Sequence, residues 1–581
     1  MRYRNFQKDV NYYKRILSKK KIKNIYIHGN MNKSAFFSIA PFSRATSELG
    51  IDMSVSFSHN NNKDPIIFRI WQTYLDLKNK NMTKEAKALN ELLNEINIKD
   101  FKKYFEPVDC VLSVKKKGFC GNLSLDYKNT WYEDFLKTKL RKTGKAIIKN
   151  VYALKKSERF GMGFELIPNK KFLSHPLQDY LDSYAISYSV FLAAKNNCKS
   201  IKLSASTKRE NMRDVPEKTS ELMATFVGLE LEKNIPLPIF KKYRKFSNLL
   251  KLDDIKIPHA TFSIAGKGYH GKHLFGEKIG YPTKNMKTKW NSPGSMIYKY
   301  HWAPQSEFED RPPLCRRGFT STVPIDKLIE STLINYKLMR KRNAKIGKEL
   351  EKCEKIFVKS NIKNGCDFEV GLIYNGKKRR ILPSDSDARN IINQRMYKET
   401  KKKFGMMANI PGGEAFVAPS YLIGKIVGDV TINIDRSYTL NAKNPFIAKA
   451  TRKGYKILSG PKKVVNAFNN RKKQAWQRIL EQQKNKSLSK EIIKLKKKNF
   501  ENIGEFAINT NPHAKLCDYL IVNEKIANMI HIAFGSGYEP ELATEYHMDV
   551  VIDSPRQKLD IYGIDKKGKK YWIIKEGQFV I

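Results

Sequence analysis

The chain has 581 residues and carries 109 Lys and Arg against 57 Asp and Glu, a formal net charge of +52. Apolar residues make up 41% and aromatic residues 11% of the chain, which is enough for sizeable cores and excludes disorder throughout. Seven cysteines without a Cys-x-x-Cys pair exclude a disulfide scaffold. They favour free thiols in a reducing compartment.

The sequence gives no sign of a membrane or secreted protein. The first ten residues lack the apolar segment of a secretory signal, and no run of about 18 uncharged apolar residues occurs anywhere. We therefore expect a cytoplasmic protein without a membrane partner.

The positive charge is spread along the whole chain, in short lysine runs such as 19–21, 115–117, 401–403 and 496–498. Lysine far outnumbers arginine, and asparagine and isoleucine are abundant, as expected from an AT-rich genome. A large positive field also attracts nucleic acid. We prefer a solvated lysine surface because we find no zinc finger or aromatic RNA-binding motif, and a nucleic-acid partner stays possible.

The first part of the chain has the alternation of strands and helices that is typical of an α/β domain. The segment 34–49 has helical spacing and ends at Gly50, a residue that often follows a helix. The expected strands are 24–28, 53–57 and 200–204, and the expected helices are 34–49, 83–96, 177–196 and 217–229.

A Gly-, Pro-, Tyr- and His-rich stretch at about 259–313 has no regular periodicity, and we expect an irregular insertion there. We place the main boundary directly after it. The predicted domains are an enlarged α/β N-terminal domain over 1–320 and a β-rich α+β catalytic domain over 321–581.

The second half is predicted to be richer in strands. Asn375-Gly376 between two β-rich runs predicts a type I′ hairpin turn. The expected helices are 324–353 and the strongly basic 464–500, and the expected strands are 356–360, 367–374, 377–382, 415–418, 426–434 and 505–508, with a hairpin at 558–581.

Three motifs in this half contrast with the lysine-rich background. The first, at 409–419, presents Glu414 directly after Pro-Gly-Gly, and the second, at 504–512, begins with Gly504-Glu505. The third runs from His531 through a glycine-rich turn to Tyr538 and on to the pair His547-x-Asp549.

The residue types in these motifs are those of a metal site. On a strand, His547 and Asp549 would point to the same side. Each motif alone has a plainer explanation: a surface ion pair, a tight turn, or a buried structural histidine. Together, two histidines and three carboxylates form the nitrogen and oxygen set expected for two divalent metal ions.

The same motifs, in the same order, resemble the aminopeptidase T/aminopeptidase S group of metallo-aminopeptidases, the thermophilic aminopeptidase family. The similar segments include 409–419, 504–512, 531–549, the connecting stretch 518–527 and the closing 575–580. The resemblance covers about 324–581, whereas residues 1–320 match only in their α/β character and are longer than in the family.

The resemblance implies a two-domain, clamshell-like aminopeptidase that uses two divalent ions (Zn, Co or Mn). It implies a homodimer that acts on peptides with a free N-terminus. The implied metal ligands are Glu414, Glu505, His531, His547 and Asp549. Glu414 or Glu505 would shuttle the proton, and Tyr538 would donate a hydrogen bond to the oxyanion. The alternatives are a two-metal hydrolase of a different amide and a nucleic-acid-associated phosphoesterase.

Overall fold

The structure, a computed structural model, describes two compact units. The described residues are 5–19, 24–31, 33–60, 87, 111–115, 138–173, 175–206, 260–265, 316–388, 406–485, 490–537, 542 and 544–581. Unit 1 comprises those up to Ile325 together with Met406, and unit 2 comprises the others.

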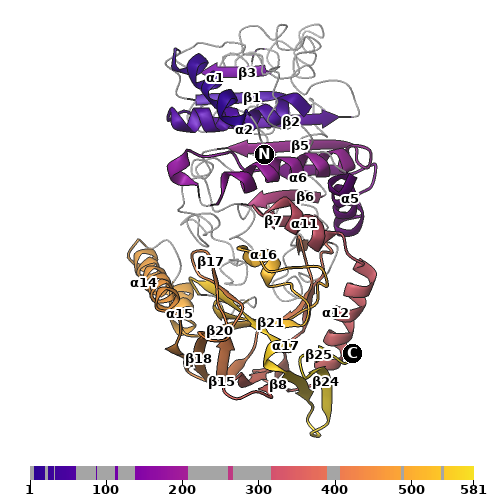
Figure 1. Cartoon of the computed structure of the whole chain (residues 1–581), viewed down its shortest axis with the longest axis vertical. Coiled ribbons are helices and arrows are strands. Elements are labelled where there is room, and N and C mark those ends of the chain that lie inside the picture. The colour runs from indigo at the N-terminus through magenta and orange to yellow at the C-terminus, as the bar shows by residue number, and fades with distance from the viewer. Residues whose placement is uncertain are drawn as a thin grey trace. The chain divides into compact units, whose positions relative to one another are not determined.

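Unit 1 is built on a mixed sheet whose strands follow the order β7-β6-β4-β5-β2-β1-β3 (Figure 1). Its strands are β1 (Asn24–Asn30), β2 (Asp52–Asn60), β3 (Val111–Lys115), β4 (Arg159–Gly163), β5 (Ser200–Ser206), β6 (Ala260–Ala265) and β7 (Arg316–Ser321). Strands β1 and β2 run parallel, and β4, β5, β6 and β7 are joined by parallel pairings. Strands β2 and β5 are antiparallel.

The helices described in unit 1 are α1 (Phe6–Ser18), α2 (Lys33–Glu48), α5 (Thr138–Ala146), the π-helix η2 (Ile147–Tyr152), the short η3 (Lys170–Phe172) and α6 (Leu177–Lys195). Phe36 of α2 stacks on Tyr188 of α6, with ring centroids 5.9 Å apart. The predicted α2 and α6 are confirmed, and Gly50 ends α2 with a φ of 68°, a conformation that glycine adopts without strain.

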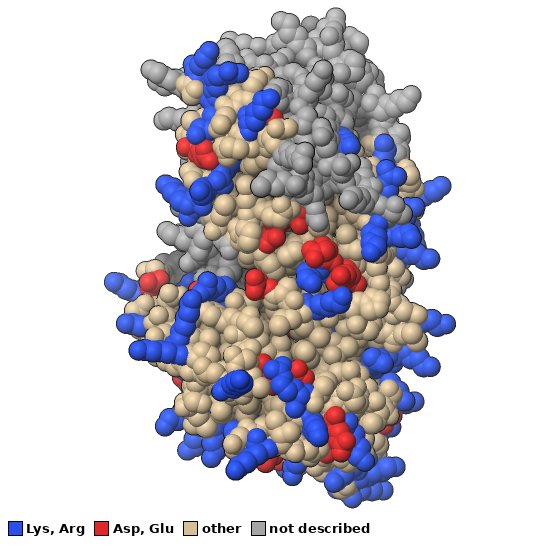
Figure 2. Space-filling model, viewed as in Figure 1, with Lys and Arg blue, Asp and Glu red and all other residues tan. Residues whose placement is uncertain are grey.

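Lysine and arginine side chains are scattered over the visible face and do not gather in one patch (Figure 2). Acidic residues are fewer and lie between them. The picture fits a generally cationic surface better than one focused docking site.

Unit 2 contains two antiparallel sheets and the predicted hairpin. One sheet has the order β12-β14-β20-β21-β22-β16-β17, with β12 (Leu382–Ser384), β14 (Glu414–Val417), β20 (Ile503–Asn509), β21 (Met529–Gly535), β22 (His547–Asp553), β16 (Thr431–Asn433) and β17 (Ser437–Thr439). The other has the order β19-β18-β15-β9-β8-β23-β24-β25, with β19 (Gly454–Ser459), β18 (Phe446–Thr451), β15 (Tyr421–Gly428), β9 (Asp367–Gly371), β8 (Lys355–Ser360), β23 (Leu559–Ile564), β24 (Lys570–Lys575) and β25 (Gln578–Phe579).

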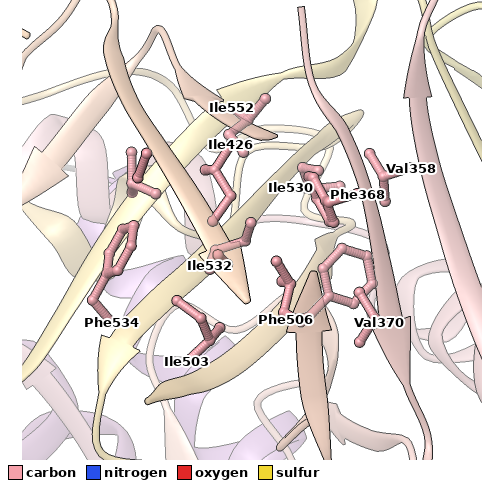
Figure 3. Packing of buried hydrophobic residues seen from close by; sticks show 14 of the residues in the cluster. Val358, Phe368, Val370, Ile426, Ile503, Phe506, Ile530, Ile532, Phe534 and Ile552 are labelled. Carbon is pink, nitrogen blue, oxygen red and sulfur yellow. The ribbon is translucent and has the colours of Figure 1, made fainter. Parts of the chain in front are cut away.

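The apolar faces of these two sheets form the core of unit 2 (Figure 3). Phe368 of β9 meets Phe506 of β20 edge to face, at 6.2 Å between ring centroids. Ile530 and Ile532 of β21 and Ile552 of β22 are fully buried in the same cluster. Because side chains alternate along a strand, the residues between them point to the opposite face of the seven-stranded sheet.

The hairpin turn is confirmed. Strands β10 (Ile373–Tyr374) and β11 (Lys377–Lys378) pair across Asn375-Gly376. Both turn residues have positive φ angles, 49° and 72°, as a type I′ turn requires.

Two predicted helices are wrong in length. The helix expected at 324–353 is two, α11 (Ile325–Thr332) and α12 (Tyr336–Leu350). The side chain of Asn335 accepts a hydrogen bond from the Leu338 N–H and so begins the second helix. The helix expected at 464–500 is also two, α14 (Lys462–Lys484) and α15 (Lys490–Lys498). Asn485, a poor helix former, follows the first.

Two predictions of strand content are also corrected. The stretch 259–313 was expected to be irregular, yet it begins with strand β6. Ala260, Phe262 and Ile264 are buried there with the period of two that marks a strand. The single strand expected at 426–434 is divided between β15 and β16, which belong to different sheets.

The C-terminal strands β23, β24 and β25 confirm the predicted hairpin. The helices expected at 83–96 and 217–229 lie outside the described residues, apart from residue 87. Within the described ranges, no helix is long and apolar enough to cross a membrane.

Candidate metal centre

The five predicted metal ligands lie on one face of the seven-stranded sheet. His531 of β21 stands opposite Ala507 of β20 on one side and Val551 of β22 on the other. Asp549 stands opposite Ala533. The alanines keep this face open between the longer polar side chains, while the intervening Ile and Phe residues turn into the core.

A β-bulge at Gly504 turns Glu505 onto this face. The pairing shifts between Ile503 and Glu505. In a regular strand, residues three positions apart point to opposite faces, but the bulge lets both Ile503 and Phe506 reach the apolar core. A side chain at Gly504 would meet the Ser536 carbonyl oxygen, at 2.1 Å from the Cβ position. The glycine therefore permits the bulge, and the bulge aims the glutamate.

His531 lies between two glutamates. Its Nε2 is 3.3 Å from Glu505 Oε1 and 3.5 Å from Glu414 Oε2. Glu414 comes from the first position of β14, opposite Asn509. Ligand atoms of Glu414, Glu505 and His531 all lie within 4.8 Å of one another, so these three could hold one metal ion.

His547 lies beside the same Glu505. Its Nε2 is 3.2 Å from Asp549 Oδ1 and 3.9 Å from Glu505 Oε2. The two oxygens of Glu505 thus face different histidines, which is the arrangement of a carboxylate that can bridge two cations.

Both histidines are held by their Nδ1 atoms. His547 Nδ1 lies 2.7 Å from the Ser536 carbonyl oxygen, which can only accept, so Nδ1 carries the proton. His531 Nδ1 donates in the same way to Asn509 Oδ1 at 2.8 Å. Their Nε2 lone pairs then face carboxylate oxygens, and a cation, either a proton or a metal ion, must lie between.

Two buried oxygens strengthen the fit to a metal. Glu414 Oε2 and Asp549 Oδ2 have no hydrogen-bond partner among the described residues. Buried carboxylate oxygens are almost always hydrogen-bonded or bound to a cation. Free oxygens beside two oriented histidines are the donor set that divalent zinc, cobalt or manganese prefers.

Two further residues belong to the cluster and were not singled out from the sequence. Glu524 groups with His531 and Asp549 in an alternative set that could hold a metal ion, and both sets use His531. Lys525 places its Nζ 2.6 Å from Glu414 Oε1 and 2.8 Å from Glu524 Oε1. The signal was their position in 518–527, a segment similar to the aminopeptidase family.

Charges in this cluster shift one another's pKa values. Burial opposes the charge on His547, but the Asp549 carboxylate outweighs it and raises the pKa of His547 to about 10. Burial likewise opposes charge on His531, whose pKa is nonetheless raised by the hydrogen bond to Glu505 and by Glu414. Burial raises the pKa of Glu524 to about 7, although Lys525 acts against it.

The structure therefore brings together Glu414, Glu505, His531, His547 and Asp549. Tyr538 lies outside the described residues. Glu505 and His547 are the more accessible members, with 14% and 24% of their side-chain surface exposed, whereas the other three are nearly inaccessible.

Comparison with known proteins gives no family. No family model and no curated protein matches the chain. AmpT from Thermus thermophilus has a TM-score of 0.39 at 13% identity, with 76% of this chain and 99% of AmpT covered. A 2,5-dihydroxypyridine dioxygenase from Pseudomonas putida KT2440 has a TM-score of 0.41 at 12% identity, covering 76% of this chain and 96% of the dioxygenase. These TM-scores decide no function.

Proposed function

We propose that the chain is a metal-dependent aminopeptidase that removes N-terminal residues from peptides. The observation that supports it is the convergence of two histidines and three acidic residues on one sheet face, with two buried carboxylate oxygens left free for a cation. The motif order that resembles aminopeptidases T and S then selects peptide hydrolysis among the reactions such a cluster serves.

When bound, two divalent ions would polarise the scissile carbonyl and supply a nucleophilic hydroxide at neutral pH. The protein's part is to orient and to move protons. His531 and His547 present Nε2, each fixed through Nδ1. Glu505 lies between them and is partly accessible, so it is the carboxylate better placed to carry a proton to the leaving amine.

Glu414 is less suited to proton transfer. One of its oxygens is engaged by Lys525 and the other faces His531. We assign it to metal binding alone. The family resemblance implies three further parts of this proposal. Tyr538 would donate a hydrogen bond to the oxyanion, the free N-terminus of the peptide would anchor the substrate, and the protein would be a homodimer.

A direct test compares matched substrates with and without a chelator. The purified full-length protein, reloaded with Zn, Co or Mn, should release the first residue from a dipeptide or an aminoacyl-nitroanilide. It should leave the N-acetylated forms intact, and the chelator should abolish the reaction.

Two single histidine variants, one inside and one outside the site, provide the control for this test. His531→Ala should lose activity, whereas His513→Ala should keep it, because His513 is an exposed histidine of the same unit. Equal cleavage of acetylated and free substrates would contradict an aminopeptidase and favour a hydrolase of another amide. Chelator-sensitive cleavage of single-stranded DNA, with no peptide turnover, would instead favour the phosphoesterase.

A further inference from the structure

Lys525 is a buried ammonium inside the candidate metal centre, with only 1% of its side chain exposed. Burying an ammonium is costly unless it is fully paired. Here two carboxylates pair with it, Glu414 at 2.6 Å and Glu524 at 2.8 Å. The proposed hydrolysis gives this lysine no chemical step, so its presence needs another explanation.

The lysine gives the two carboxylate oxygens of Glu414 different surroundings. Nζ takes Oε1, while Oε2 stays without a hydrogen bond among the described residues and lies 3.5 Å from His531 Nε2. A glutamate has three side-chain torsions, and a free carboxylate would sample many orientations. The ammonium leaves one oxygen, and only one, directed to the metal side.

The backbone of Lys525 is itself fixed to the loop that carries Glu414. The Asn511 N–H donates to the Lys525 carbonyl at 2.9 Å, and the Ala527 N–H donates to the Asn511 carbonyl at 3.0 Å. The Asn511 side-chain amide donates to the Gly412 carbonyl at 2.8 Å. One asparagine thus holds the lysine segment and the glutamate loop in a single arrangement.

We propose that Lys525 is a positioning residue that presents Glu414 to the metal as a one-oxygen ligand. The inference rests on the proposed function only in taking Glu414 as a ligand. It requires no particular substrate. Lys525 acts through the Glu414 carboxylate that it contacts.

Zinc affinity, measured by competition with a chromophoric chelator on the full-length protein, tests this role. Lys525→Met should weaken zinc binding about 10- to 100-fold, the usual effect of losing a residue that orients a ligand. Lys515→Met is the matched control: this lysine lies in the same unit with 64% of its side chain exposed, and zinc affinity should not change.

A double-mutant cycle separates positioning from a general loss of structure. If Lys525 acts through Glu414, Lys525→Met should cost no further zinc affinity in a Glu414→Gln background. Wild-type zinc affinity in Lys525→Met, or a full additional loss in the double variant, would overturn the proposal. A protein without peptidase activity would leave this comparison intact, so failure of the proposed function is separately visible.

Lys525→Met removes the ion pair of the buried Glu524 and could therefore unfold the protein. Should circular dichroism show it unfolded, the charge-balanced Glu524→Gln/Lys525→Met variant takes its place. Its zinc affinity should be about 10- to 100-fold weaker than that of Glu524→Gln alone. Equal affinities would overturn the proposal.

Discussion

Individual protons decide whether the two site histidines can bind a metal. In the metal-free protein the Asp549 carboxylate raises the pKa of His547 to about 10, and neighbouring glutamates also raise that of His531. At neutral pH a proton therefore occupies the place on His547 that a metal must take. Metal and proton compete for the same lone pair.

Zinc binding should consequently tighten as the pH rises. Displacing the proton of His547 predicts an apparent dissociation constant that falls about tenfold per pH unit between pH 7 and about pH 9. Titration calorimetry in buffers of different ionisation enthalpy would also show proton release. An affinity independent of pH over this range would contradict the assignment of His547 as a ligand.

Asp9 allows a residue-scale prediction in unit 1. It is buried in α1, and its Oδ2 has no hydrogen-bond partner among the described residues. Burial raises the pKa of Asp9 to about 6, although Lys8 acts against it. The folded state thus binds the proton more tightly than the unfolded state does, so stability is lost as the pH rises from about 4 through 6.

Asp9→Asn should therefore stabilise unit 1 by about 1–3 kcal/mol at pH 8. The difference from wild type should shrink as the pH falls and vanish below about pH 3.5, where Asp9 is protonated in both the folded and the unfolded state. Thermal melting of both proteins at the two pH values measures it. A variant that melts below wild type at pH 8 would show that the ionised carboxylate is favourable in the fold.

Among the secondary-structure elements, the register of strand β20 decides which side chains face the site. Gly504 allows the bulge that separates Ile503 in the core from Glu505 on the opposite face. Gly504→Ala would bring its Cβ to 2.1 Å from the Ser536 carbonyl oxygen. That carbonyl also holds His547, so a shift there disturbs two site residues together.

We expect Gly504→Ala to lower the free energy of unfolding by about 1–3 kcal/mol, as overpacking usually does. Zinc affinity should fall with it. Gly376→Ala is the control, because no atom lies within 4 Å of its Cβ position. Gly376 also has a positive φ, so this variant shows the effect of backbone strain without a steric clash. Zinc affinity equal to wild type in folded Gly504→Ala would contradict the role of the bulge.

Much of this element-scale arrangement was readable from the sequence. The alternation of His547 and Asp549 with apolar residues predicted a shared strand face, and they meet at 3.2 Å. The type I′ turn was predictable because Asn-Gly between two strands strongly favours this turn. The break before Tyr336 was missed because the apolar spacing continues across it, and only the Asn335 cap reveals it.

The spacing of Lys525 and Glu524 in the sequence does not mark them as site residues. They follow the short helix α16 (Leu520–Asn523), and nothing in their spacing relates them to Glu414, 111 positions away in the chain from Lys525. The contact depends on how Asn511 joins distant loops. Such long-range placement is a property of the tertiary fold, which local periodicity does not encode.

For the whole molecule, the charge of +52 is the feature that hydrolysis leaves unexplained. Basic side chains are scattered over the visible described surface without a single focus (Figure 2). Such a field attracts anionic substrates over distances of about 10 Å at 0.1 M salt. Substrate charge should therefore matter more for binding than for the chemical step.

For a peptide rich in Asp and Glu, kcat/KM should fall several-fold between about 0.02 M and 0.5 M salt, with the change mainly in KM. A neutral peptide of equal length should show little change. Steady-state kinetics over a salt series measures both. Equal salt dependence for the two peptides would assign the charge to solubility and genome composition alone.

Metal content is the most direct test of the two-metal site. After dialysis against buffered zinc, the full-length protein should contain two zinc ions per chain by mass spectrometry of the metal. A folded His531→Ala/His547→Ala variant should contain none, and His513→Ala should retain both. A wild-type protein that binds no zinc, cobalt or manganese, or a double variant with undiminished metal, would contradict the assignment of this sheet face as the catalytic centre.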